Sequence, residues 1–376
     1  MHILIAPNAF KNSITATAAA TAIHEGLDQS RLKCSCSCFP IGDGGDGTGE
    51  ILIQKLNGVQ QEARVEDPVG RTISASYGII NGTTAIIEMA NASGLRLLKK
   101  QEARPLRTST FGTGQLILDA LNKGAQKIIL CIGGSATVDG GMGVLRALGA
   151  RFIREDGKEI LLTQELPQLK SIDLSLIDKR VNSCELLVLC DVDNPLLGQD
   201  GAAAVFGPQK GAGPDEIVVL ESGLKQLATV AKQINGIDIG SLRHGGAAGG
   251  TAAGLHAFLG ARLVPGLDEF LSMTRFENEL EKANLLITGE GSLDEQSLHG
   301  KGPVGLARMA KEKSIPVIGI AGRVQQHPEL QKYFIALFSI APGPDSLDEC
   351  MNRAEHLLKN TAMQLGNLLS ISGSFR

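Results

Sequence analysis

Short apolar runs alternate with stretches of helical periodicity along most of this 376-residue chain, and this alternation limits the possible folds more than any other feature. Short apolar runs between turn signals are typical of buried strands, whereas longer amphipathic stretches are typical of helices. Strands that alternate with helices form α/β folds. We predict strands at 3–6, 35–39, 73–79, 84–89, 127–132, 186–190, 285–288, 316–321 and 335–340. We predict helices at 16–27, 47–56, 112–123, 144–148, 215–233, 302–313 and 346–369.

The length and one break in the alternation predict two domains. A single hydrophobic core rarely extends beyond about 250–300 residues. The alternation breaks at about residues 64–91, where Asn81-Gly82 joins two β-rich runs and predicts an antiparallel hairpin. We expect 1–66 and 285–376 to form one discontinuous domain with a parallel sheet of five strands, and 67–284 to form an inserted α/β domain. A simple split near residue 200 is the less favoured alternative.

A tract of glycine and alanine covers residues 245–254, with the sequence GGAAGGTAAG. It is too short for a linker and precedes a helical pattern. We interpret it as a place of close backbone packing or ligand approach, and as a candidate crossing between the domains.

Composition and charge exclude several classes of partner. The 36 Lys and Arg residues and the 40 Asp and Glu residues give a formal net charge of -4, which creates no field to attract nucleic acid or an anionic membrane. Aromatic residues make up only 3% of the chain, so platforms for stacking bases or sugars are not expected. No secretory signal and no apolar run of about 18 residues is visible, which predicts a soluble cytoplasmic protein.

Residues 127–143, KIILCIGGSATVDGGMG, lead from a predicted strand through the turn Gly133-Gly134-Ser135 toward a helix. Glycines let a backbone approach an anion closely, and a helix N-terminus supplies free N–H groups and a favourable dipole. We therefore predict that Gly133, Gly134 and Ser135 hold a phosphate or carboxylate group. Asp139 has two explanations: a place beside the bound phosphate, or a cap for the following helix.

Other polar residues between glycines offer further contacts for an anion. The P-loop pattern and the motifs of protein kinases are absent, so phosphate binding requires another design. Lys210 lies in FGPQKG, Glu290 in TGEG and Lys301 in HGKG. Lys301 precedes the predicted helix start at Pro303, where its ammonium group would reach a nucleotide phosphate, unless it is an exposed turn lysine.

The segment from Gly42 to Gly47, GDGGDG, matches the G-x-G-x-x-G pattern of dinucleotide-binding turns. We disfavour such a site, and the NAD-dependent dehydrogenase it would imply, because two aspartates inside the turn would repel a pyrophosphate. The alternatives are helix capping and the binding of a metal ion or a hydroxyl group. We assign the functional role to Asp43 and the capping role to Asp46.

Two carboxylates and one lysine follow other predicted strands. Asp191 and Asp193 come after the run 186–190, and open α/β sheets bind ligands at the carboxyl edge of their strands. Carboxylates there hold Mg²⁺ or accept a proton from a substrate hydroxyl, unless they only close the strand in an Asx turn. Asp191 is the stronger candidate because it is closer to the strand. Lys11 follows the first strand at a helix start, where a lysine opposes the helix dipole unless an anion is bound.

Taken together, these segments resemble the type I glycerate kinase family, the bacterial glycerate 2-kinases, and the resemblance spans nearly the whole chain. It rests on APNAFKNS at 6–13, GDGGDGT at 42–48, TFGTGQLILDAL at 110–121, GGSATVDGGMG at 133–143, CDVDNPLLG at 190–198, VFGPQKGA at 205–212, GAAGGTAAG at 246–254 and TGEGSLDEQSLHGKGPVG at 288–305. Two positions depart from the family pattern: Asn8 stands where Asp is usual, and Asp46 where Glu is usual. The first departure argues against any role that needs a negative charge at position 8.

The resemblance implies a kinase that uses ATP and Mg²⁺ to phosphorylate D-glycerate at its 2-hydroxyl, giving 2-phosphoglycerate and ADP. It also implies a flavodoxin-like parallel-sheet domain and a second α/β domain similar to restriction endonucleases. Phosphorylation of the 3-hydroxyl, or a non-catalytic sensor of sugar acids or nucleotides on the same fold, are the alternatives. The protein is expected to be a monomer or a homodimer.

Phosphoryl transfer depends mainly on positioning and on charge neutralisation, which suggests a role for each candidate residue. Asp191 is predicted to act as the catalytic base or, with Asp193, as a Mg²⁺ ligand. Lys11 and Asp43 are predicted to border the carboxylate and hydroxyls of glycerate. The phosphates and the nucleotide are predicted to contact Gly133, Gly134, Ser135, Lys210, Glu290 and Lys301.

Overall fold

The apolar runs of the sequence form two main sheets, one in each of two units, so the expected mixed α/β class with parallel strands is confirmed. The structure is a computed structural model that describes residues 1–299 and 302–371, except for the side chains of Gln296 and His299. The first unit comprises Met1–Asp43 and Leu267–Arg376, and the second comprises Gly44–Gly266. Each unit is described by itself.

The first unit contains a five-stranded parallel sheet with the order β15-β13-β11-β1-β2. Its strands are β1 (His2–Ile5), β2 (Ser35–Cys38), β11 (Leu285–Thr288), β13 (Val317–Ala321) and β15 (Ala336–Ser339). The predicted pairing of the N-terminal strands with those after residue 284 is confirmed. Numbered within the unit, the order is 2-1-3-4-5, so it reverses between β1 and β11. Open parallel sheets bind ligands outside the carboxyl ends of their strands at such a reversal.

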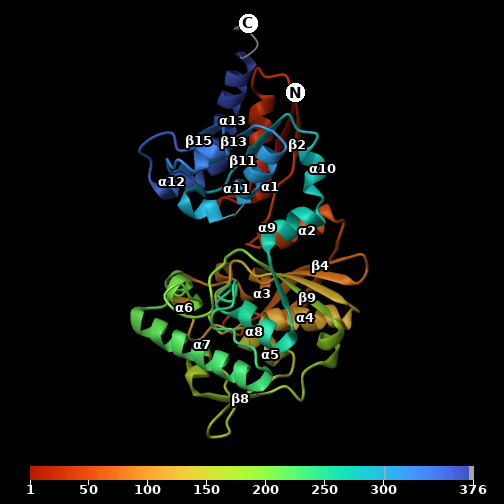
Figure 1. The fold of residues 1–376 in the computed structure, drawn as a ribbon, viewed down its shortest axis with the longest axis vertical. Helices are drawn as coiled ribbons and strands as arrows, with labels where there is room; N and C mark the ends of the chain where they lie inside the picture. Colours follow the sequence, from red (N-terminus) through yellow and green to blue (C-terminus); the bar gives the residue numbers. More distant parts are fainter. Residues whose placement is uncertain (300–301, 372–376) are drawn as a thin grey trace. The chain divides into compact units, whose positions relative to one another are not determined.

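Two long helices of the first unit, α1 (Ala16–Asp28) and α13 (Ala354–Ser370), pack side by side (Figure 1). Thr15 caps α1 by accepting a hydrogen bond from the backbone N–H of Ala18. Gly26 allows the close approach, because a Cβ there would lie 2.2 Å from the carbonyl oxygen of Lys359. The remaining elements are α9 (Gly266–Met273), α10 (Phe276–Leu280), α11 (Gly302–Glu312), α12 (Leu347–Asn352), β12 (Ser292–Leu293) and β14 (Arg323–Val324).

The second unit contains a six-stranded sheet with the order β10-β9-β6-β5-β4-β3. Its strands are β3 (Val59–Glu66), β4 (Thr72–Ile80), β5 (Thr84–Glu88), β6 (Lys127–Cys131), β9 (Glu185–Cys190) and β10 (Arg262–Pro265). The last four are parallel to one another, whereas β4 runs antiparallel to β3 and β5. The hairpin predicted at Asn81-Gly82 is confirmed, and both of these residues have positive φ.

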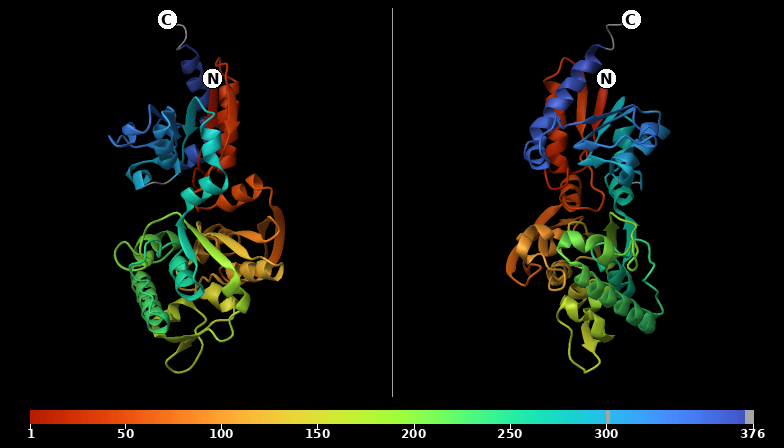
Figure 2. Two further views of the ribbon diagram at one scale, coloured as in Figure 1. Left: turned by 45° about the vertical axis from the view of Figure 1, so that its right-hand side comes forward. Right: turned by 90° about the vertical axis from the view of Figure 1, so that its left-hand side faces the viewer.

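Buried aliphatic side chains such as Ile128, Leu130 and Val188 form the core of the second unit. Figure 2 shows the helices of this unit beside its strands. These helices are α2 (Thr48–Lys55), α3 (Ala90–Ser93), α4 (Phe111–Asn122), α5 (Met142–Ala147), α6 (Ala202–Phe206), α7 (Pro214–Asn235) and α8 (Thr251–Leu259). A small sheet pairs β7 (Arg151–Arg154) with β8 (Leu169–Asp173). Within the described ranges, no helix of either unit has the length and apolar character needed to cross a bilayer.

The unit boundaries differ from the expected boundaries at residues 66 and 284. Residues 44–66 belong to the second unit, because β3 pairs with β4 along its whole length. Residues 267–284 belong to the first unit, where the ring of Phe276 makes an edge-on contact with that of Phe39. The expected helix at 346–369 is two helices, which meet at Arg353.

Candidate functional site

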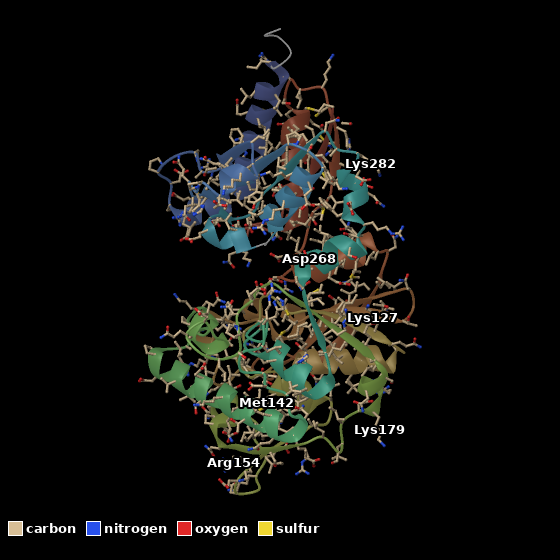
Figure 3. All side chains as sticks on the ribbon, viewed as in Figure 1. Lys127, Met142, Arg154, Lys179, Asp268 and Lys282 are labelled. Carbon is tan, nitrogen blue, oxygen red and sulfur yellow. The ribbon has the colours of Figure 1, made fainter. Side chains whose placement is uncertain are left out.

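Residues 132–141, here called the glycine loop, connect β6 to α5 in the second unit. Lys127 and Met142, the first residues of β6 and α5, are labelled in Figure 3. Gly134 has a φ of 69°, which favours glycine. Gly133 has no room for a side chain, because a Cβ there would lie 2.3 Å from the Cα of Gly45. Backbone conformation therefore explains Gly134 and close packing explains Gly133, and Ser135, which is buried, carries the first side chain after them.

The first turn of α5 is capped by groups of the protein itself. The buried Asp139 carboxylate accepts hydrogen bonds from the backbone N–H groups of Gly141 (3.0 Å) and Gly143 (3.1 Å), and from the N–H and hydroxyl of Thr110. Burial raises the pKa of Asp139, and these hydrogen bonds oppose that rise. The capping explanation for Asp139 is therefore the one the contacts support. The expectation of free helical N–H groups beside Gly133 is wrong, because α5 begins only at Met142 and its first N–H groups donate to Asp139 and Thr110.

Lys210 brings a buried ammonium group to the glycine loop. It ends a short turn of 3₁₀ helix at Pro208–Lys210, and its Nζ donates hydrogen bonds to Ser135 Oγ and to the carbonyl oxygen of Thr137, both at 2.8 Å. Burial lowers the pKa of Lys210 to about 8, and the carboxylates of Asp139 and Asp191 act against that fall. The glycine loop thus has a cation held by its own atoms.

Asp191 and Asp193 follow β9, the sheet neighbour of β6, and their carboxylates have different surroundings. Asp191 acts electrostatically on Lys210. Asp193 instead pairs with the guanidinium of Arg243 at 3.2 and 3.3 Å, and lies 3.2 Å from Nδ1 of His244. In residues 1–299 and 302–371, no three or more His, Cys, Asp or Glu side chains group closely enough to hold a metal ion.

The glycine and alanine tract at 245–254 packs against the glycine loop. A Cβ at Gly249 would lie 2.0 Å from the carbonyl oxygen of Thr137, and one at Gly254 would lie 1.9 Å from that of Gly140. The N–H of Gly140 donates to the carbonyl oxygen of Gly249 at 3.1 Å. Close backbone packing is therefore confirmed, whereas the crossing between domains is wrong, because the whole tract lies inside the second unit.

A second group of polar side chains, here called the acidic cluster, lies in the first unit at the carboxyl ends of β1, β2 and β11. Its members are Asn8, Lys11, Asp43, Glu290 and Asp294. The backbone N–H of Asn8 donates to the carbonyl oxygen of Gly289 at 2.8 Å, which joins the segments after β1 and β11. The side-chain amide of Asn8 donates to Asp43 Oδ2 at 2.9 Å, and both residues are buried. The acidic cluster therefore occupies the reversal of strand order, where ligand sites are expected.

Glu290 is the buried acid of this cluster. The pKa of Glu290 is raised to about 7, mainly by burial and in part by the carboxylates of Asp43 and Asp294. The hydroxyl of Ser297, which donates to Glu290 Oε1 at 2.8 Å, and the charge of Lys11 act in the opposite direction. A carboxyl group among other carboxylates is better suited to accept a hydrogen bond from a hydroxyl than to contact phosphate oxygens directly.

The predicted site residues fall into two sets. Lys11, Asp43 and Glu290 meet in the acidic cluster of the first unit, whereas the second unit holds Gly133, Gly134, Ser135, Lys210, Asp191 and Asp193. Lys301 lies outside the described residues.

One expected role is wrong and one residue was missed. Asp46 does not cap α2, since the N-cap is Gly47 and the carboxylate of Asp46 pairs with Arg96 at 3.1 Å. Glu88, a buried acid at the end of β5, belongs to no recognisable motif. Its only signal in the sequence is a charged residue that ends an apolar run.

Comparison with known proteins identifies relatives of this chain over almost its whole length. The chain matches the family described as the glycerate kinase family over residues 3–370. It is 44% identical to the glycerate kinase of Halalkalibacterium halodurans, covering 96% of this chain and 97% of the relative. It is 41% identical to the glycerate 2-kinase of Escherichia coli K12, covering 99% of this chain and 98% of the relative. A crystal structure of a Salmonella typhimurium LT2 protein assigned as glycerate kinase 2 superposes with a TM-score of 0.82 at 40% identity, covering 100% and 99% of the two chains.

Proposed function

Because the chain belongs to the glycerate kinase family, we propose that it transfers the γ-phosphoryl group of ATP to the 2-hydroxyl of D-glycerate, giving 2-phosphoglycerate and ADP. The observation that carries this proposal is the buried ammonium of Lys210 on Ser135 of the glycine loop, an arrangement suited to a phosphate group. The choice of the 2-hydroxyl is supported by the E. coli relative, which is named a glycerate 2-kinase.

The glycine loop and Lys210 are proposed to bind the phosphates of ATP. Gly133 and Gly134 carry no side chain, so their backbone can approach phosphate oxygens closely, and Ser135 adds a hydroxyl. The buried hydroxyl oxygen of Thr137 has no hydrogen-bond partner among the described residues, which is unusual for a polar atom inside a protein. A bound group or an ordered water at the loop would satisfy it. Lys301 is retained as a further proposed contact with phosphate.

Asp191 is proposed to be either the Mg²⁺ ligand or the proton acceptor for the substrate hydroxyl. Asp191 acts electrostatically on Lys210, which is proposed to contact phosphate, so the Asp191 carboxylate belongs to the same site. Bound Mg²⁺ would neutralise phosphate oxygens, and an aspartate with substrate oxygens is the ligand set it prefers. Asp193 fits this role less well, because Arg243 already pairs with its carboxylate.

The acidic cluster is proposed to hold glycerate. Lys11 provides a positive charge for the glycerate carboxylate, and Asp43 and Glu290 provide acceptors for its hydroxyl groups. We propose that Glu290 contacts hydroxyl groups rather than phosphates, because its neighbours Asp43 and Asp294 are acids. The position of the cluster at the strand-order reversal supports a ligand site.

The finer description of the fold is also a proposal. The strand order 2-1-3-4-5 of the first unit is that of flavodoxin-like sheets, which supports a flavodoxin-like domain. The likeness of the second unit to restriction endonucleases rests on the family resemblance.

The test is an ADP-release assay with D-glycerate, followed by phosphorus NMR of the product. We expect ADP formation that depends on D-glycerate and a product identified as 2-phosphoglycerate, with L-glycerate as the control substrate. A product identified as 3-phosphoglycerate would overturn the regiochemistry. Tight binding of D-glycerate without ADP formation would favour the sensor.

A further inference from the structure

Glu88 is a buried acid that the proposed chemistry does not use. It is the last residue of β5, it is 5% exposed, and it pairs in register with Cys131 of β6. Its side chain lies against the start of α2, where a Cβ added at Gly49 would be 3.1 Å from Glu88 Oε2. The side chain is therefore enclosed between the sheet and the turn that precedes α2.

Charged and polar groups from each neighbouring element define the state of this acid. Asp46 shares a side-chain hydrogen bond with Glu88, and the backbone N–H of Gly47 donates to Glu88 Oε1. The pKa of Glu88 is raised to about 8, mainly by burial and in part by Asp46, whereas Gly47 and Arg96 act to lower it. The thiol of Cys131 has its own pKa raised by burial and by Glu88, so it adds no charge at neutral pH.

The hydrogen bond between the two acids has a defined direction. The carboxylate of Asp46 pairs with the guanidinium of Arg96 at 3.1 Å, so one of its oxygens already accepts from a cation. Glu88 is buried, and burial disfavours its ionised form. Glu88 is therefore the neutral acid that donates, and Asp46 is the carboxylate that accepts.

The turn of residues 44–47 that Glu88 holds is in direct contact with the glycine loop. The backbone N–H of Gly133 donates to the carbonyl oxygen of Gly44 at 3.1 Å. A Cβ added at Gly133 would strike Gly45, and one at Gly134 would lie 3.3 Å from Asp46 Cβ. Any movement of the turn would therefore move the residues proposed to bind phosphate.

We propose that Glu88 is a positioning residue for the phosphate site: through its hydrogen bonds with Asp46 and Gly47 it holds the turn of residues 44–47 against Gly133 and Gly134. This inference rests on the proposed function for its kinetic consequence only. Ionisation of Glu88 would place two carboxylates in contact and push the turn from the glycine loop.

Glutamine at position 88 reproduces the neutral acid. Its amide nitrogen can donate to Asp46, and its amide oxygen can accept from the N–H of Gly47, but it cannot ionise. Glu62→Gln is the matched control, because Glu62 is an exposed residue of β3 in the same sheet.

The first measurement is the thermal midpoint of unfolding as a function of pH, which needs no substrate. A carboxyl whose pKa is higher in the folded than in the unfolded state contributes stability that is lost as pH rises from about 5 to about 8. Over this pH range, we expect the thermal midpoint of Glu88→Gln to rise relative to that of the wild type. The midpoint of Glu62→Gln should change with pH as that of the wild type does. If the thermal midpoints of Glu88→Gln and the wild type differed by the same amount at every pH, the proposal would be overturned.

The second measurement is the KM for ATP. We expect Glu88→Gln to stay within about twofold of the wild type at pH 7, and the ratio of wild-type to variant KM to rise at least about threefold by pH 9. Lys210 is present in both proteins, so its titration cancels in this ratio. A KM for Glu88→Gln raised more than about tenfold at pH 7, or a ratio independent of pH, would overturn the proposal. A wild-type enzyme that forms no ADP from D-glycerate would overturn the proposed function instead, and the unfolding curves would still decide the state of Glu88.

Discussion

The ammonium nitrogen of Lys210 lies 2.8 Å from Ser135 Oγ, in a position that is only 3% exposed. Lysine is rarely buried to this extent unless it is paired. Here the desolvation of the charge is offset by hydrogen bonds to Ser135 and Thr137 and by the carboxylates of Asp139 and Asp191. The Lys210 side chain is therefore held against the glycine loop by direct hydrogen bonds.

Substituting Lys210 by methionine keeps most of the volume and removes the charge. Hydrogen bonds to a charged group contribute about 1.5–3 kcal/mol, so we expect the KM for ATP to rise roughly 10- to 100-fold. Lys225→Met, an exposed change on α7, serves as the control. Steady-state kinetics at pH 7, with thermal unfolding to verify folding, makes the comparison. An unchanged KM in Lys210→Met would remove Lys210 from the phosphate site.

Asp191→Asn and Asp193→Asn form a matched pair on one segment. We expect Asp191→Asn to lower kcat at least about tenfold, a loss of ~1.4 kcal/mol or more of transition-state stabilisation. We expect a smaller effect for Asp193→Asn, because Arg243 already pairs with that carboxylate. Repeating the assays over a range of Mg²⁺ concentrations separates the two roles of Asp191: a lost ligand shifts the metal requirement, whereas a lost base leaves it in place. The assignment of Asp191 fails if its variant keeps more than a tenth of the activity.

Glu290→Gln tests the acidic cluster through pH. The pKa of Glu290 is raised to about 7, so the acceptor form should be lost as pH falls through 7. We expect kcat/KM for D-glycerate to fall below pH 7 in the wild type, and expect the variant to have a lower activity without this acid limb. The raised pKa also affects stability: the protonated Glu290 stabilises the wild type at low pH, so the variant should gain in stability relative to the wild type as pH rises from about 5 to about 7. If kcat/KM for Glu290→Gln still fell below pH 7, another group would be responsible for that fall.

Gly133→Ala tests the contact between the glycine loop and the turn of residues 44–47. The new methyl group would lie 2.3 Å from the Cα of Gly45, so backbone has to move, and we expect a loss of about 1–3 kcal/mol in the free energy of unfolding. Gly343→Ala is the control, because no atom lies within 4 Å of a Cβ there. We expect its free energy of unfolding to change by less than about 0.5 kcal/mol. Urea titrations of both variants provide the measurement, and equal effects would show that the contact at Gly133 is not restrictive.

Periodicity in the sequence was sufficient to locate the strands of the first sheet and the hairpin of the second. Apolar runs located the strands of the first sheet, and Asn81-Gly82 located the hairpin of the second. β3 was missed because its sequence, VQQEARVE, is largely polar, as suits a strand at the edge of a sheet with much of its length in solvent. The unit boundary at Asp43 could not be predicted either, since it depends on the pairing of β3 with β4.

Motifs in the sequence located parts of the candidate site, but they did not predict which of its side chains are buried or which groups they contact. Lys210 was identified from glycine spacing, yet its burial depends on Ser135 and Thr137, which are remote in sequence. Asp139 was left with two explanations until its contacts with Thr110 and Gly143 were visible. Glu88 gave no local signal at all, because its role depends on a turn that precedes it by about forty residues and on a loop that follows it by a similar distance.

The first unit takes its sheet from two distant parts of the chain, and this has a consequence for biosynthesis. β2 ends at Cys38 and β11 begins at Leu285, with the whole second unit between them. At about 5–20 residues per second, a ribosome needs on the order of 10–50 s to extend the chain from one to the other. During that interval β1 lacks its neighbour β11, and the unpaired edge is a template for wrong strand pairing. Glu290 joins Asp43 only afterwards, so the acidic cluster is among the last parts of the molecule to assemble.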